Sequence, residues 1–197
     1  MSRYDADNVY CYEGSAVLRN KLGITDQLLL EKFESDITSS RLIELELKPI
    51  QGKFDLKHLQ AIHHAVFQDV YDWAGKIRTV DISRENSRFA NIRMIDSASK
   101  KLFTNLVKEN LFKNQNTQKV SSRLAHYLSE INVLHPFRDG NGRVQRVFIA
   151  QLALALGYKL SYSDLKQSEM YDAMEKAFFG DETQLASLIL EKLTTKK

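Results

Sequence analysis

Apolar side chains recur every three or four residues along most of the chain, which is the spacing of an amphipathic helix. The pattern is clearest between Gln118 and Leu134, where it predicts one helix with a continuous apolar face. The same spacing predicts further helices over residues 15–22, from Thr25 or Asp26 onwards, over 55–75 and 97–112, and after caps at Ser163 and Asp181. Only two prolines and eight glycines interrupt the chain, so we expect a mainly α fold.

Two segments depart from this amphipathic pattern. Residues 147–156 are apolar on nearly every side and are followed by Gly157, which predicts a helix in the middle of the core that begins near Gly142. Residues 79–83 alternate between polar and apolar side chains, which is the period of a strand. With a polar tip over 84–87 and a return over 89–92, they predict a hairpin that needs support from helices.

Composition narrows the classes of function. The length of 197 residues suits one domain, with a core over about 15–193. The net charge of +3 and the absence of a basic stripe with interleaved aromatics give no support to nucleic-acid binding. No apolar run approaches a membrane span, no apolar leader segment is present, and Cys11 is the only cysteine, so we expect a cytoplasmic protein.

The densest chemistry lies in residues 135–146, between two predicted helices. The second helix begins within this run, and the first turn of a helix offers free N–H groups and partial positive charge to an anion. Gly140 and Gly142 let a phosphate approach the backbone, and Asn141 between them offers an amide. Arg143 and Arg146 share one helix face, where their guanidinium groups suit phosphate oxygens.

The same run supplies a base and a carboxylate. His135 titrates near neutrality, and Pro136 favours an extended conformation that would project it into the site. Asp139 would repel phosphate unless a cation lay between them, so it is a candidate Mg²⁺ ligand. Phe137 lies between polar residues and is expected to anchor the loop in the core. Together these residues favour transfer from a nucleotide to a hydroxyl group that His135 activates.

This loop resembles the signature of the Fic domain family: His, any residue, Phe, any residue, Asp or Glu, Gly-Asn-Gly-Arg, two residues, Arg. Every defining position is present. Residues 71–83 are similar to the segment that leads into the family's β-hairpin, called the flap, and 87–90 to its return strand. Residues 18–24 also resemble small single-domain members. The resemblance implies one Fic domain over residues 1–197, a compact helical bundle with a flap at about 77–92 beside the active-site loop 135–146.

The resemblance further implies a protein adenylyltransferase, which transfers AMP from ATP to a Tyr, Ser or Thr hydroxyl of a target protein. His135 would be the general base, Asp139 the Mg²⁺ ligand, and residues 140–142 the phosphate cradle. Arg143 and Arg146 would bind the β- and γ-side oxygens. The flap would dock the target by β-addition through Thr79, Val80, Asp81, Ile82 and Phe89.

Several alternatives stay open. Doc-like phosphotransferases carry Lys where this chain has Gly142, which disfavours that branch. A different donor, such as UTP or a phosphocholine carrier, or a catalytically silent nucleotide-binding scaffold would also use such a loop.

Regulation is a further open question. Many family members carry an inhibitory helix in which Ser or Thr precedes Glu by four residues and Gly or Asn follows. The stretches Ser40–Glu44 and Ser187–Glu191 lack that last residue, so we expect a separate antitoxin-like protein to supply the inhibitory glutamate to Arg146. The chain would then be the toxin of a toxin–antitoxin pair.

Overall fold

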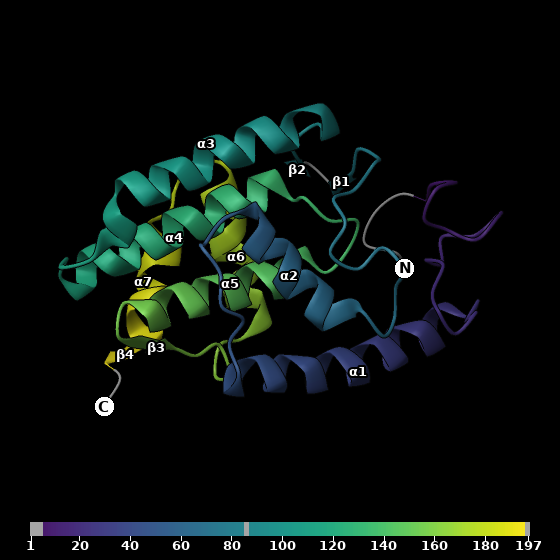
Figure 1. Cartoon of the computed structure of the whole chain (residues 1–197), viewed down its shortest axis with the longest axis horizontal. Helices are drawn as coiled ribbons and strands as arrows, with labels where there is room; N and C mark the ends of the chain where they lie inside the picture. The colour runs from purple at the N-terminus through teal and green to yellow at the C-terminus, as the bar shows by residue number, and fades with distance from the viewer. Residues whose placement is uncertain (1–5, 85–86, 196–197) are drawn as a thin grey trace.

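The computed structural model describes residues 6–84 and 87–195 of the chain. Helices dominate this part, as Figure 1 shows. They are α1 (Gln27–Leu47), α2 (Leu56–Phe67), α3 (Ile95–Lys108), α4 (Thr117–Leu134), α5 (Asn141–Ala155), α6 (Gln167–Phe178) and α7 (Thr183–Lys192), with short 3₁₀ turns η1 (Ile92–Met94) and η2 (Asn110–Phe112). Within the described residues, no helix combines the length and apolar character that crossing a bilayer requires.

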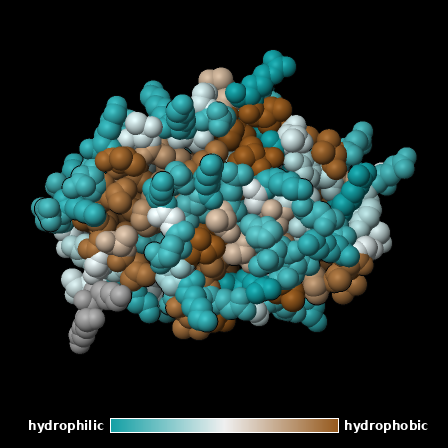
Figure 2. Space-filling view, viewed as in Figure 1, coloured by the Kyte–Doolittle hydropathy of each residue, from teal (hydrophilic) through white to brown (hydrophobic). Residues whose placement is uncertain are grey.

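The core is built around α4 and α5. In Figure 1 these two helices run through the middle, between α3 on one side and α1 on the other. α4 packs chiefly against α5 and α7, and α5 packs against α2. The expectation of a central α5 is confirmed, because Val144, Phe148, Ile149 and Leu152 are fully buried. Hydrophilic side chains cover most of the face in Figure 2, where separate hydrophobic patches interrupt them.

Some helix starts follow from local capping. Asp26 accepts from the Leu29 N–H at 2.8 Å and Asp55 accepts from the His58 N–H at 2.9 Å, so both predicted caps are confirmed. Asp181 accepts from the Thr183 N–H at 3.0 Å from two residues before α7, whose N-cap residue is Glu182. The predicted cap at Ser163 is wrong, because its hydroxyl bonds to Ser161 and Asp164 and α6 begins only at Gln167.

Three other expectations about helices are wrong. Residues 15–22 form bends, an isolated bridge from Leu18 to Cys11 and a turn. The side chain of Asn20 donates to the Leu18 and Ile24 carbonyls, and these local bonds compete with a helix. The helix predicted over 55–75 ends at Phe67, and a series of turns carries the chain on to Gly75. The predicted 97–112 helix ends at Lys108, and Val107, which we expected to point inward, is 62% exposed.

The strands are few and short. The hairpin forms between β1 (Ser83–Arg84) and β2 (Ser87–Arg88), further along than the alternation at 79–83 predicted. Part of its predicted tip, residues 85–86, lies outside the described residues. A second pair, β3 (Tyr158–Leu160) with β4 (Leu193–Thr195), follows α5 and α7 and has no strong sequence signal. Leu193, which the periodicity assigned to the last helix, lies in β4.

Candidate active site

The loop between α4 and α5 is held in shape by its own residues. The side-chain oxygen of Asn141 accepts from the Phe137 N–H at 2.9 Å, and its amide donates to the Phe137 carbonyl at 2.7 Å. Both polar ends of this side chain are therefore bonded inside the loop. Phe137 is 1% exposed, which confirms that it anchors the loop in the core.

His135 ends α4 in the left-handed conformation, with φ 44° and ψ 60°. The expectation of an extended backbone before Pro136 is therefore wrong. The reason is the helix end itself, because the His135 N–H still donates to the Ile131 carbonyl at 3.0 Å and a left-handed residue is a common way to end a helix. The carbonyl of His135 accepts from Nε of Arg78 at 2.8 Å.

The imidazole of His135 has a defined tautomer. Its Nδ1 lies 2.9 Å from the Asn132 carbonyl, which accepts a hydrogen bond, so Nε2 is the nitrogen that can take a proton. The ring of Phe89 stacks on the imidazole at 3.6 Å between centroids and leaves the residue 6% exposed. Burial lowers the pKa of His135 to about 3, so the ring is neutral and able to accept a proton at pH 7.

The start of α5 forms a cradle of backbone N–H groups. Gly140 caps the helix with φ 78°, and a Cβ there would lie 2.3 Å from the Phe67 ring, so the position requires glycine. Among the described residues, no hydrogen bond uses the N–H groups of Asn141 or Gly142. Nη1 of Arg146 lies 3.5 Å from the position that a Cβ on Gly142 would take, so this guanidinium is beside the cradle.

Arg143 points away from this arrangement, towards α1. Its Nη2 donates to Glu34 at 2.5 Å, and its Nη1 donates to Thr38 at 3.0 Å. The guanidinium also lies over the Phe67 ring, 4.6 Å from its centroid. Tyr71 donates its hydroxyl to the other oxygen of Glu34, and burial raises the pKa of that tyrosine above its ordinary value. The two signature arginines therefore have different surroundings, although they share a helix.

Asp139 lies between the base and the cradle. Its carboxylate accepts from the Gly140 N–H, and its carbonyl accepts from Nε2 of His63 at 3.0 Å. His63 in turn accepts from the Gly75 N–H at 2.8 Å through Nδ1 and packs against the Phe137 ring at 4.0 Å between centroids. In the described part of the chain, three or more His, Cys, Asp or Glu side chains do not gather as ligands for a metal ion.

Some of the predicted flap residues are buried, and others are exposed to solvent. Ile82 and Phe89 are buried, at 7% and 8% exposure. The carbonyl of Val80 accepts from Nη1 of Arg78 at 2.8 Å. Asp81 is bonded within the flap to Asn91, and Thr79 lies beside the hydroxyl of Tyr10 at 3.3 Å.

Sequence analysis missed the residues that hold this site from a distance. Glu34, His63 and Arg78 each contact the loop or α5 but lie 57 to 109 positions away in the chain. None of the three stands out in the sequence, because a contact between residues so far apart in the chain leaves no local pattern. The segment 71–83 resembled the family, and this resemblance was the only signal that pointed towards Arg78.

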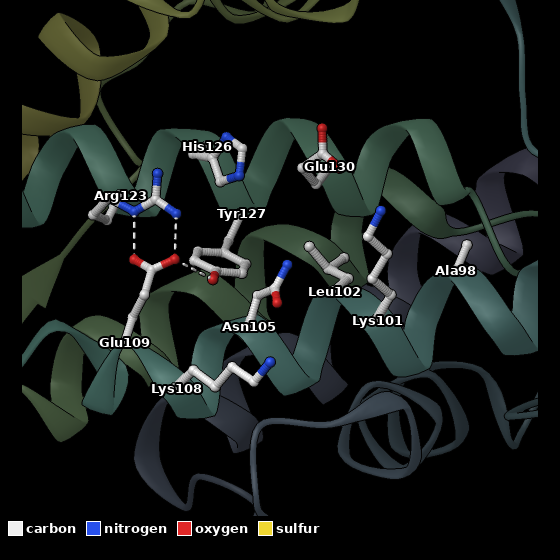
Figure 3. A pocket seen from close by; sticks show the side chains of 10 residues that line it. All are labelled: Ala98, Lys101, Leu102, Asn105, Lys108, Glu109, Arg123, His126, Tyr127 and Glu130. Carbon is white, nitrogen blue, oxygen red and sulfur yellow. Dashed lines mark hydrogen bonds and ion pairs between the residues drawn. The ribbon is translucent and has the colours of Figure 1, made fainter.

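A groove on the surface lies away from the active-site loop. This groove of about 440 Å³ between α3 and α4 is lined by Lys101, Asn105, Glu109, Arg123 and Tyr127, among others, and includes no residue of the loop (Figure 3). Glu109 accepts from Arg123 at 2.6 and 2.7 Å and from Tyr127 at 2.8 Å, so these groups satisfy one another. We therefore assign the chemistry to the loop and not to this groove.

Comparison with known proteins decides the family. A model of the Fic/DOC family matches residues 53–153, which include α2, the hairpin and the whole loop. The chain belongs to the Fic/DOC family. It is 40% identical over 195 residues to protein adenylyltransferase VbhT of Bartonella schoenbuchensis, covering 98% of this chain but 41% of VbhT. It is 37% identical over 188 residues to the Fic protein of Escherichia coli strain K12, covering 95% of this chain and 92% of that protein.

Solved structures agree with this membership. The N-terminal Fic domain of a VirB-translocated effector from Bartonella quintana, solved with bound ADP, has a TM-score of 0.89 and 28% identity and covers 95% of each chain. The expected Fic-type helical bundle with a small hairpin is therefore confirmed.

Proposed function

We propose that this protein is a protein adenylyltransferase that uses ATP and modifies a hydroxyl side chain of a target protein. The oxygen of the target hydroxyl would attack the α-phosphorus of ATP, and pyrophosphate would leave. Nε2 of His135 would take the hydroxyl proton. The observation that carries the proposal is the loop. It joins a neutral imidazole of fixed tautomer to a helix start where the first N–H groups have no acceptor among the described residues. The name of the relative VbhT supports AMP as the transferred group.

The phosphate contacts follow from the surroundings of each group. In this proposal, the N–H groups of Asn141 and Gly142 and the guanidinium of Arg146, which lies beside Gly142, would bind phosphate oxygens. Arg143 is bonded to Glu34 and Thr38, so in this proposal it supports the cradle from behind. This assignment differs from the resemblance, which gave both arginines to the phosphates.

A magnesium ion fits the residues present. Mg²⁺ is commonly held by one or two carboxylates together with the phosphates of a substrate, and Asp139 supplies one carboxylate beside the cradle. When bound, the ion would neutralise charge on the phosphates. The flap, with Thr79 and Asp81 towards solvent, would dock the target beside His135.

We further propose that the protein is the toxin of a toxin–antitoxin pair and acts in the cytoplasm. Glu44, one of the two candidate inhibitory glutamates, bonds to Arg41 on its own helix at 2.8 Å. Glu191 lies on α7, which packs mainly against α4 and α6. An inhibitory glutamate for Arg146 would therefore come from a second protein. Co-purification of the untagged neighbouring gene product with the chain would support this, and activation of the isolated chain by Glu44→Gly or Glu191→Gly would contradict it.

The central experiment labels a cell lysate with ATP carrying ³²P at either the α or the γ position. Label from the α position should appear on protein with the wild-type chain and disappear with His135→Ala, while affinity for ATP is retained. Loss of a general base typically lowers a rate by about 10²–10⁴-fold. Label from the γ position alone would favour a phosphotransferase. Binding of ATP without any transfer, in lysates from several sources, would favour a scaffold, and competition by other nucleotides would test the donor.

A further inference from the structure

Arg78, near the start of the flap, is a buried arginine beside the active-site loop. It is 2% exposed, and the residue lies outside both the active-site loop and the helices. Burial of a charged guanidinium costs free energy unless its N–H groups find acceptors. The acceptors that Arg78 finds therefore indicate which parts of the molecule it holds together.

Among the described residues, the hydrogen-bond acceptors of Arg78 are carbonyl groups from three segments. Nε donates to His135 at 2.8 Å, Nη1 donates to Val80 at 2.8 Å, and Nη2 donates to Ala90. Val80 precedes the hairpin and Ala90 follows it, so one side chain joins both arms of the flap to the residue that carries the base. The backbone N–H of Arg78 adds a bond to the Pro136 carbonyl at 2.9 Å.

We propose that Arg78 is a positioning residue that fixes the flap, and with it the target segment, relative to His135. This inference rests on the proposed function, because it assumes that the flap docks the target. The acceptors are main-chain carbonyls, so the contacts fix the course of the backbone itself. A guanidinium is planar and rigid, and three bonds from one such group set the relative positions of all three segments. Phe89, which stacks on the imidazole, directly precedes Ala90 and is held by the same clamp.

Arg78→Lys is the variant that tests this role. Lysine keeps the positive charge, which matters because Arg78 and Arg84 lower the pKa of His135 while Asp139 raises it. The substitution therefore removes the three-way geometry and keeps the charge. We expect transfer to lysate proteins to fall by about 10²-fold, as displacements near 1 Å can produce, with affinity for ATP unchanged.

The matched control is Arg123→Lys. Arg123 also uses two donors in one contact, to Glu109, but it lines the groove in Figure 3 and touches neither the flap nor the loop. This variant should leave both transfer and ATP affinity at the wild-type level. Wild-type transfer by Arg78→Lys, or equal losses of transfer and ATP affinity, would overturn the proposal.

A second variant covers the case in which Arg78→Lys fails to fold. Asp81 lies 3.5 Å from Nη1 of Arg78, its side chain is 47% exposed, and it accepts from the Ile92 N–H at 2.8 Å. Asp81→Asn weakens the clamp from the solvent side without opening the core. It should lower transfer and leave ATP affinity unchanged, and wild-type transfer would contradict the proposal.

Hydrogen–deuterium exchange separates this proposal from the proposed function. Either clamp variant should speed exchange of the amides in residues 79–84 and 87–92 and leave α1 unchanged. If the wild-type chain shows no transfer at all, the proposed function fails, and unchanged exchange in the flap would then reject the clamp independently.

Discussion

Arg143 and Arg146 illustrate how little residue type alone determines a role. Both are arginines three positions apart on α5, and in the sequence both suit a polyphosphate. In the structure Arg143 is taken up by Glu34 and Thr38, whereas Arg146 lies beside Gly142. The difference arises from α1, whose approach to α5 no local pattern in the sequence reveals.

A nucleotide series distinguishes the two arginines. Arg146→Met should weaken binding of ATP by tenfold or more and leave AMP nearly unchanged, because a hydrogen bond to a charged group contributes about 1.5–3 kcal/mol. Arg143→Met should affect AMP, ADP and ATP alike. Titration calorimetry with the three nucleotides measures both. A loss for Arg143→Met that grows with the number of phosphates would mean that this residue touches them directly.

At the scale of elements, strongly periodic helices were predictable and short strands were not. The apolar pattern predicted the start of α4 to within one residue, at Gln118 where the helix begins at Thr117. A regular period over eighteen residues is a strong signal that single exceptions do not obscure. Residues 15–22 show the opposite case, since a few side-chain bonds decide so short a segment. Within the site, residues 135–146 carried their chemistry in their order, but their distant supports Glu34, His63 and Arg78 did not.

Phe89 of the flap stacks on the His135 ring and contributes to the burial that lowers the pKa of His135. In Phe89→Ala, water would reach the His135 ring, so its pKa should rise from about 3 towards the ordinary value of about 6.5. Because transfer requires the neutral ring, the acid limb of the rate profile should move to higher pH. Titration of the His135 ring by nitrogen NMR measures the change in pKa. Labelling rates between about pH 4 and 8 measure the shift of the acid limb.

Phe179→Ala is the control for that variant, since Phe179 is 66% exposed and its ring contacts Phe178, whereas Phe89 stacks on His135. It should leave the titration of His135 unchanged. An unchanged pKa in Phe89→Ala would mean that other parts of the protein keep water from the ring.

At the scale of the whole molecule, buried neutral histidines make stability depend on pH. Burial lowers the pKa of His63 to about 4, and both of its ring nitrogens are bonded in the neutral form. The unfolded chain binds a proton near pH 6.5, so this contribution is complete above about 6.5 and is lost as pH falls towards the folded value. His58 and His135, whose pKa values are also lowered, act in the same direction.

The free energy of unfolding should therefore fall between pH 7 and pH 5. Urea unfolding at both values measures it, and His63→Gln should reduce the dependence on pH because glutamine does not titrate. The slope should persist in part, since the other two histidines remain. An identical slope in His63→Gln would show that His63 is not a source of the acid sensitivity.

The pair of hydrogen bonds between Asn141 and Phe137 has a thermodynamic consequence. Two hydrogen bonds already order the loop between α4 and α5. The loop therefore loses little further backbone entropy when a ligand binds there, because that entropy was lost during folding. If the proposed function holds, association with nucleotide should proceed as a single diffusional step, without a slow isomerisation, and the heat capacity change should report only the apolar area that the bound base covers.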